Sequence, residues 1–153
     1  MNIHLIAVGK ARSGPEKTLT DGYLKQCGWP SALSEVALKK TPANSDERKR
    51  LEADLLLNAV PAGARLVALD ERGKALTSEA LADRLGQWED NGSRDVALVL
   101  GGADGLHKDV RARADLVLAL GQLTWPHMLA RAMVAEQLFR CWSIRTGHPY
   151  HRR

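Results

Sequence analysis

The chain has 153 residues, 44% of them hydrophobic and 26% charged, which is the usual composition of one globular domain. Its longest apolar runs are too short to span a bilayer and its first residues lack the pattern of a signal peptide, so we expect a cytoplasmic protein that does not enter a membrane. The net charge of +4 is a mild indication of a polyanionic partner, although an ordinary solvated surface explains this total better.

Short apolar runs alternate with helical patterns along the whole chain. Branched and apolar residues between turns predict strands, and apolar residues that recur every three or four positions predict helices. The predicted strands cover residues 3–8, 32–38, 64–69, 95–100 and 116–120. The predicted helices cover residues 16–27, 45–60, 77–90, 107–113 and 126–143, and a turn is predicted at residues 70–73.

This alternation predicts one α/β domain over residues 1–153, with a mostly parallel sheet flanked by helices on both faces. In open sheets of this kind, ligands bind beyond the carboxyl ends of the strands. Three such ends suit a ligand pocket, namely residues 69–70, 100–102 and 120–125.

The sequence GGADG at residues 101–105 follows the fourth predicted strand. Glycines let the backbone approach a ligand without interference from a Cβ atom, but they also form tight turns between a strand and a helix. The run lacks the lysine of a P-loop and the spacing of a dinucleotide-binding loop, and its position after a strand argues against a KH loop. A second glycine-containing loop at Gly121 favours a pocket shared by two loops over a simple turn.

The last predicted helix carries two apolar strips. The first, at the spacing of a core-facing helix, consists of Met128, Ala132, Ala135, Phe139 and Trp142. The second consists of Val134, Leu138 and Cys141. Since one sheet face needs only one strip, the helix is either deeply buried in its own domain or contacts another subunit. We favour the second interpretation and expect a homodimer.

The chain ends in a chemically reactive run that contains His148, Tyr150, His151, Arg152 and Arg153. Imidazole groups exchange protons near neutral pH and arginines bind phosphate, so this tail suits acid–base chemistry on a nucleic acid, and a disordered tail is the alternative. Metal binding is disfavoured, because no cysteine or carboxylate lies nearby at ligand spacing. The two cysteines of the chain are far apart in sequence and are expected to be reduced and structural.

Three motifs together resemble one protein family: GGADGL after a strand, LTWPHMLARAMVAEQLFRCWSI, and the terminal HPYHRR. The segments NIHLIAVGK and VALDERG also match, so the resemblance covers essentially the whole chain. The family that the chain resembles is ribosomal RNA large subunit methyltransferase H, a group of small single-domain pseudouridine-N3 methyltransferases in the SPOUT superfamily. The resemblance implies a SPOUT-type α/β knot, in which the C-terminal part of the domain forms a trefoil knot.

The resemblance also implies an activity, a cofactor and partners. Proteins of this family are homodimers that use S-adenosyl-L-methionine to methylate N3 of a pseudouridine in 23S ribosomal RNA within the assembled ribosome, and no metal is implied. By position, the family's cofactor contacts fall on Leu69, Gly101, Leu120, Gly121, Gln122, Leu123, Thr124 and Trp125. The family's substrate-side residues, which are the candidates for catalysis, fall on His148, Tyr150, His151 and Arg152, with Arg131 a weaker candidate.

The chain departs from the family pattern at Trp125, where a smaller aliphatic residue is expected, and at Gly147, where asparagine is expected. The chemistry requires a group that removes the proton from N3 of the pseudouridine. His148, Tyr150 and His151 are the candidate bases, and the two terminal arginines would stabilise the anion or bind phosphate. The alternative functions are a non-catalytic RNA-binding or ribosome-assembly factor on the same fold, and a flavodoxin-like nucleotide enzyme.

Overall fold

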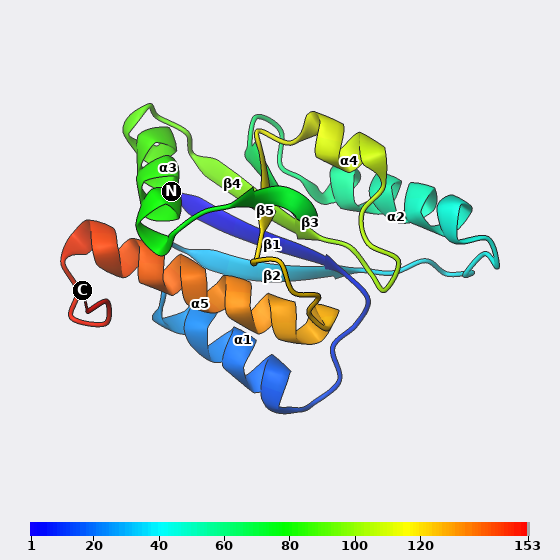
Figure 1. Cartoon of the computed structure of the whole chain (residues 1–153), viewed down its shortest axis with the longest axis horizontal. Coiled ribbons are helices and arrows are strands. Elements are labelled where there is room, and N and C mark those ends of the chain that lie inside the picture. Colours follow the sequence, from blue (N-terminus) through cyan, green and yellow to red (C-terminus); the bar gives the residue numbers. More distant parts are fainter. Residues whose placement is uncertain (153) are drawn as a thin grey trace.

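Residues 1–152, which the computed structural model describes, form five strands and five helices that alternate along the chain (Figure 1). The strands are β1 (Asn2–Val8), β2 (Ser31–Val36), β3 (Arg65–Ala75), β4 (Asp95–Leu100) and β5 (Leu116–Ala119). The helices are α1 (Pro15–Gln26), α2 (Ser45–Ala59), α3 (Ser78–Asp90), α4 (Lys108–Arg113) and α5 (His127–Thr146). The predicted role of Arg153 lies outside the described residues.

The five strands form one parallel sheet in the order β2-β1-β4-β3-β5. The predicted α/β architecture is therefore confirmed. Alternate residues of β1 point to opposite faces, as strand geometry requires: Ile3 and Leu5 join the core beneath α1, α3 and α5, whereas Ile6 and Val8 join the core beneath α2 and α4. Figure 1 shows the two helical layers on either side of the sheet.

Local sequence explains where the long helices begin and end. The side chain of Asn44 accepts a hydrogen bond from the backbone N–H of Glu47 at the start of α2, and Thr77 does the same for Ala80 at the start of α3. Helix α5 ends at Gly147, whose φ of 71° is left-handed. Asparagine and glycine are the two residues that best adopt this conformation, so glycine in place of the expected asparagine keeps the same helix end.

The turn predicted at residues 70–73 is wrong, because β3 continues through it. Leu69 and Lys74 both pair with Leu118 of β5, so the residues between them form a bulge within the strand. A Cβ atom on Gly73 would lie 2.7 Å from the backbone of Leu118, so this close approach requires glycine. The charged residues and glycine of the bulge are typical of a turn, and only long-range pairing with β5 keeps them in a strand.

The second apolar strip of α5 is not a free surface. Val134, Leu138 and Cys141 are buried within the chain, in the same core as Ala135 and Phe139 of the first strip. The strip therefore gives no support to the predicted homodimer, which stays a prediction that needs another surface. The trefoil knot also stays a prediction.

Both cysteines, Cys27 and Cys141, are free and buried. Burial raises the pKa of each thiol, to about 12 for Cys141, so the reactive thiolate is suppressed. None of the helices in residues 1–152 has an apolar stretch that could cross a lipid bilayer.

Candidate cofactor pocket and C-terminal tail

The carboxyl ends of β4 and β5 and the start of the β3 bulge meet at one edge of the sheet. Strand β3 lies between the other two, and Leu69 near its middle pairs with Leu100 of β4 on one side and Leu118 of β5 on the other. The three segments that were predicted from the sequence to border a ligand pocket are therefore neighbours in space. The bulge of β3 begins at this same edge.

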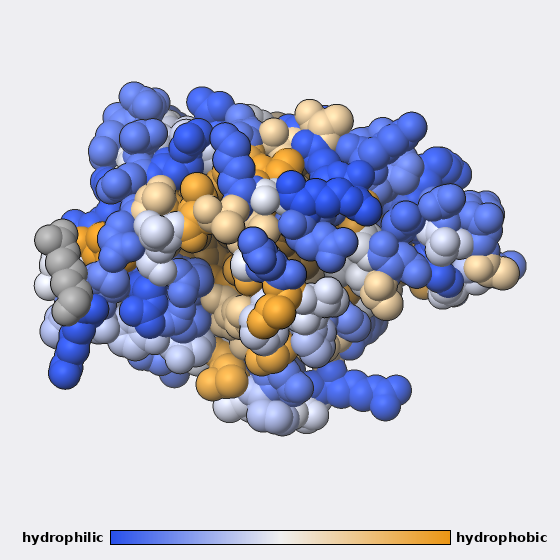
Figure 2. Space-filling view, in the orientation of Figure 1, coloured by the Kyte–Doolittle hydropathy of each residue, from blue (hydrophilic) through white to orange (hydrophobic). Residues whose placement is uncertain are grey.

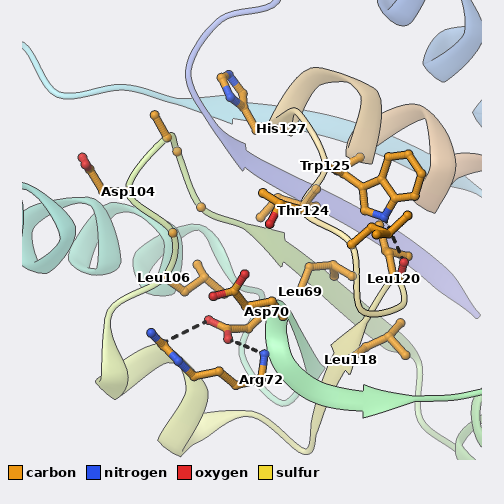
Figure 3. Close-up of a pocket in the computed structure, with 18 of the residues that line it drawn as sticks. Leu69, Asp70, Arg72, Asp104, Leu106, Leu118, Leu120, Thr124, Trp125 and His127 are labelled. Carbon is orange, nitrogen blue, oxygen red and sulfur yellow. Dashed lines mark hydrogen bonds and ion pairs between the residues drawn. The ribbon is translucent and has the colours of Figure 1, made fainter.

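A cavity of about 300 Å³, here called the strand-end cavity, opens between these segments (Figure 3). Its apolar walls come from all three strand ends and from the first turn of α5, and they include Leu69, Leu100, Leu106, Leu118, Leu120 and Ala130. Charged side chains lie at its rim, and they include Lys49, Glu71, Arg72 and Asp104, with the His127 imidazole beside them. Apolar walls with a few polar groups are typical of a site that encloses a small organic molecule.

Glycines bring the loop after β4 close enough to form the cavity wall. A Cβ atom on Gly101 would lie 2.7 Å from the backbone carbonyl of Gly105, so the two ends of this loop can meet only without a side chain. Gly105 and Gly121 have φ angles of 79° and 92°, which are left-handed conformations that suit glycine. The backbone of Gly101 and Gly105 therefore borders the cavity directly, with no side chain in between.

Trp125 closes the loop that follows β5. Its indole Nε1 donates a hydrogen bond to the backbone carbonyl of Leu120 at 3.0 Å, as Figure 3 shows. An aliphatic residue, which the family resemblance predicts here, could not make this bond. The indole therefore adds a covering side chain and a fixed loop end to the same cavity.

Seven of the eight predicted cofactor residues border the strand-end cavity, namely Leu69, Gly101, Leu120, Gly121, Leu123, Thr124 and Trp125. Gln122 is exposed and does not border it. The structure therefore brings the predicted set together, except for this one side chain at the outer end of the loop.

Asp70 is a cavity residue that the sequence did not single out for a role. Its carboxylate, only 6% exposed, accepts hydrogen bonds from the backbone N–H of Arg72 at 2.9 Å and from the guanidinium of Arg111 at 3.2 Å. Arg111 also donates to the carbonyl of Leu106 at 2.7 Å. The carboxylate thus ties the β3 bulge to the segment after the glycine loop, and its place directly after a predicted strand was the signal that could have identified it.

Helix α2 holds the glycine loop from outside. The Arg48 guanidinium donates to Asp104 at 2.5 Å, and this hydrogen bond keeps the pKa of that carboxyl below its usual range. One turn later, the Glu52 carboxylate is buried behind Gly102, where an added Cβ would lie 3.4 Å from it. Burial, followed by the Asp104 charge, raises the pKa of Glu52. No local pattern predicts this contact, because α2 is far from the loop along the chain.

The C-terminal tail, residues 148–152, folds back onto the end of α5 rather than extending into solvent. The backbone N–H of His148 donates to the carbonyl of Ser143, and the Tyr150 ring lies 4.4 Å from the Phe139 ring between centroids. His148 and Arg152 are exposed, whereas only 14% of the His151 side chain is exposed. The disordered tail that the sequence left open as an alternative is therefore not what the described residues adopt.

The surroundings of the tail distinguish the candidate bases. Burial and a hydrogen bond to the Glu136 carboxylate raise the pKa of Tyr150 above its ordinary range. A phenol in this state keeps its proton at neutral pH and acts as a hydrogen-bond donor. His148 is the more accessible of the two imidazoles and is thus better placed to meet a substrate than His151.

The strand-end cavity and the tail lie at opposite ends of α5. His127, the first residue of the helix, is at the cavity rim, and the tail follows Thr146, its last residue. A helix of 20 residues is about 30 Å long. The tail turns back along α5 as far as Glu136, but none of residues 148–152 borders the strand-end cavity of the same chain.

Arg131, the weaker sequence candidate, is not a pocket residue. It is 2% exposed and donates to the backbone carbonyls of Val8 and Gly9, each at 2.7 Å, and to the Glu35 carboxylate at 2.7 Å. These contacts hold the ends of β1 and β2 against α5. The residue therefore serves the fold at this edge of the sheet.

Comparison with known proteins identifies the family. The family model described as predicted SPOUT methyltransferase matches residues 1–151. The chain belongs to the SPOUT methyltransferase family. It is 59% identical over 152 residues to a ribosomal RNA large subunit methyltransferase H from Rhodospirillum centenum, with 99% of each chain covered. A protein of the same name from Paramagnetospirillum magneticum is 51% identical over 152 residues, again with 99% of each chain covered. The resemblance carried by the sequence motifs is confirmed.

Solved structures share the SPOUT architecture. A methylase family protein from Haemophilus influenzae aligns with 99% of this chain and 71% of its own, with a TM-score of 0.61 and 13% identity. A Legionella pneumophila methyltransferase, described in complex with the bound cofactor SAM, aligns with 95% of this chain and 66% of its own, with a TM-score of 0.52 and 12% identity. At such low identity, these matches show a common fold.

Proposed function

We propose that this chain is an S-adenosyl-L-methionine-dependent methyltransferase that modifies N3 of a pseudouridine in 23S ribosomal RNA and acts on the assembled ribosome. The observation that carries the proposal is the strand-end cavity, which is bordered by seven of the eight residues expected to contact the cofactor, in a chain of the SPOUT methyltransferase family. The name shared by its relatives supports large-subunit ribosomal RNA as the substrate.

The residues of the strand-end cavity fit the proposed cofactor. Leucines such as Leu69, Leu106 and Leu120 would enclose the faces of an adenine ring, and the loop backbones offer N–H and C=O groups to its edge. The mixed charges of the rim, with Arg72 and Glu71 among them, suit an amino-acid end that carries an ammonium and a carboxylate. When bound, S-adenosyl-L-methionine supplies a methyl group that is electrophilic because it is attached to a positively charged sulfur.

In this proposal the tail residues act on the RNA. His148 would accept the proton from N3 of the pseudouridine, since it is exposed and Tyr150 keeps its own proton. The Tyr150 hydroxyl, which donates to Glu136, would hold the tail in place, and the exposed Arg152 would bind phosphate. Holding base, nucleophile and methyl group in one geometry supplies much of the rate increase in a displacement reaction of this kind.

We further propose a homodimer, because none of the tail residues 148–152 borders the strand-end cavity of its own chain. An apolar groove of about 510 Å³ between α1 and α5 offers a contact surface, and it shares Leu118, Leu120 and Gly121 with the strand-end cavity. Leu19, at the edge of this groove, is 47% exposed. Figure 2 shows apolar residues gathered in the middle of one face of the molecule, among hydrophilic ones. A second copy that docks there would lie beside the first copy's cavity.

A thermal-shift comparison of S-adenosyl-L-methionine, FMN and ATP tests the cofactor. A ligand present at 100 times its Kd stabilises the folded state by about 2.7 kcal/mol, and we expect this only for S-adenosyl-L-methionine. A shift with FMN or ATP instead would support a nucleotide enzyme. RNA binding without any cofactor shift would support a non-catalytic assembly factor.

Mass spectrometry of 23S ribosomal RNA tests the reaction. RNA from a strain that lacks this protein should carry a pseudouridine without its methyl group, and purified protein with cofactor should restore that group. Assembled ribosomes and free 23S ribosomal RNA are offered side by side. Equal methylation of the free RNA would contradict the assembled ribosome as the substrate.

A further inference from the structure

Glu136 is the centre of a polar cluster on α5, and the proposed chemistry assigns no role to its carboxylate. Its side chain is 17% exposed, and its Oε1 accepts hydrogen bonds from the Tyr150 hydroxyl at 2.9 Å and from Nε of Arg140 at 2.9 Å. Its Oε2 accepts a hydrogen bond from the Gln137 amide at 2.7 Å. One carboxylate thus joins three donors, whereas an ordinary ion pair along a helix joins only one.

The cluster is itself anchored outside α5. The Gln137 side-chain oxygen accepts a hydrogen bond at 2.7 Å from the hydroxyl of Ser78, the first residue of α3. The carboxylate is therefore connected through one amide to a second helix of the same layer. Such a connection fixes the direction in which the carboxylate presents its other oxygen.

The other oxygen, Oε1, holds the C-terminal tail through its bond with the Tyr150 hydroxyl. The Tyr150 ring lies between Phe139 and the guanidinium of Arg140, which is 4.9 Å from the ring centroid. Nη1 of Arg140 is also 3.4 Å from Nδ1 of His151. Glu136 orients both Tyr150 and Arg140, and through them it sets the path of the residues that follow α5.

We propose that Glu136 is the positioning residue of the C-terminal tail, which holds residues 148–152 in the single direction that delivers them to the substrate. This inference rests on the proposed methyltransferase function and adds a residue to it. Glu136 acts through Tyr150 and Arg140 and does not touch the strand-end cavity. Without the carboxylate, Tyr150 loses its acceptor and Arg140 its counter-charge, so the tail samples many directions and the reacting groups meet rarely.

Two variants of Glu136 and one matched control test this role. Glu136→Ala removes every acceptor, whereas Glu136→Gln keeps an oxygen for the Tyr150 hydroxyl but loses the charge. The control is Asp54→Asn, which removes the charge of another carboxylate that pairs with an arginine four residues away on a helix. Each protein is assayed for rRNA methylation, for cofactor affinity by calorimetry, for association by sedimentation, and for hydrogen exchange of residues 148–152.

We expect kcat to fall about 10-fold or more in Glu136→Ala, because hydrogen bonds to a charged group are lost, and to fall less in Glu136→Gln. Cofactor Kd should match the unsubstituted protein, and hydrogen exchange of the tail should rise in the order of the kcat losses. Because Glu136 also lines the apolar groove proposed for the second copy, kcat is compared at protein concentrations at which sedimentation shows every variant to be associated. Asp54→Asn should leave kcat, cofactor Kd, association and hydrogen exchange of the tail unchanged.

Other outcomes overturn the proposal. Unchanged kcat with a protected tail in Glu136→Ala would show that the tail needs no such anchor. Lost cofactor affinity or lost association, in either variant, would show a structural role. If Glu136→Ala does not fold, Glu136→Gln decides alone, and its unchanged kcat would refute the inference. Failure of the unsubstituted protein to methylate ribosomal RNA would instead refute the proposed function itself.

Discussion

Arg131 is 2% exposed, and a buried guanidinium is stable only when acceptors compensate its charge and its N–H groups. It meets the carbonyls of Val8 and Gly9 and the Glu35 carboxylate. We predict that Arg131→Met lowers the free energy of unfolding by about 2–4 kcal/mol, because it leaves these acceptors without a donor in a buried place. Urea denaturation measures the loss. Arg50→Met, which removes an exposed arginine, should change the stability by about 0.5 kcal/mol or less. A stable Arg131→Met protein that no longer methylates RNA would instead place Arg131 in the active site.

Glu52 is a second buried ionisable residue, and burial of its charged form destabilises the folded protein. Its pKa is raised in the folded state, so the folded protein binds this proton more tightly than the unfolded chain does. The stability that the protonated form contributes is present below the unfolded pKa and is lost as pH rises through the folded pKa.

We predict that Glu52→Gln is more stable than the unsubstituted protein at neutral pH, by about 1 kcal/mol, and that the advantage disappears near pH 4. Paired urea titrations at the two pH values measure the difference. Glu47→Gln, on the exposed side of the same helix, is the control and should show no such pH dependence. Equal effects of Glu52→Gln at both pH values would show that burial of the charge does not govern this site.

At the scale of the element, the glycine loop after β4 depends on the absence of side chains. A Cβ atom on Gly101 would lie 2.7 Å from the backbone of Gly105, so the loop must shift to accept Gly101→Ala. Because the same backbone borders the strand-end cavity, we predict a loss of about 10-fold or more in the affinity for S-adenosyl-L-methionine, measured by calorimetry.

Gly22→Ala in α1 is the matched control for this substitution. Nothing lies within 4 Å of the added Cβ, and alanine is the better helix former by about 0.5–1 kcal/mol. The control should therefore bind cofactor normally and melt slightly higher. Unchanged affinity in Gly101→Ala would exclude this loop from the cofactor site.

Strands and helices whose signal lies in neighbouring residues were predicted well from the sequence. The strand at residues 95–100 was predicted with its exact bounds as found in β4, and the start of α3 follows from the capping side chain of Thr77. The bulge of β3 was missed, since its charged residues are held by pairing with β5 and not by their own preferences. The motifs predicted the cavity residues, and Asp70 lies at a strand end that the sequence predicted. The bond of Asp70 to Arg111 and the position of Glu52 behind Gly102 could not be predicted, because both depend on helices that are distant in sequence.

At the scale of the whole molecule, the separation of cavity and tail leads to a test of assembly. If the tail of one subunit serves the cavity of its partner, two differently damaged subunits should repair one another. One subunit carries Gly101→Ala, which damages the cavity, and the other lacks residues 148–153. At a cofactor concentration well below the Kd of the Gly101→Ala cavity, each homodimer should be nearly inactive, because every active site in it has the same defect.

In a mixed dimer, the tail of the Gly101→Ala subunit meets the intact cavity of the truncated one. Half of the dimers in an equal mixture are mixed and each has one working site, so we predict about a quarter of the normal methylation of ribosomal RNA. Two affinity tags purify the mixed dimers, and sedimentation confirms that they associate. If each tail served its own cavity, the mixture would remain inactive. A truncated protein that binds no cofactor by calorimetry would place the tail in the cofactor site, and activity in a monomer would remove the need for a second subunit.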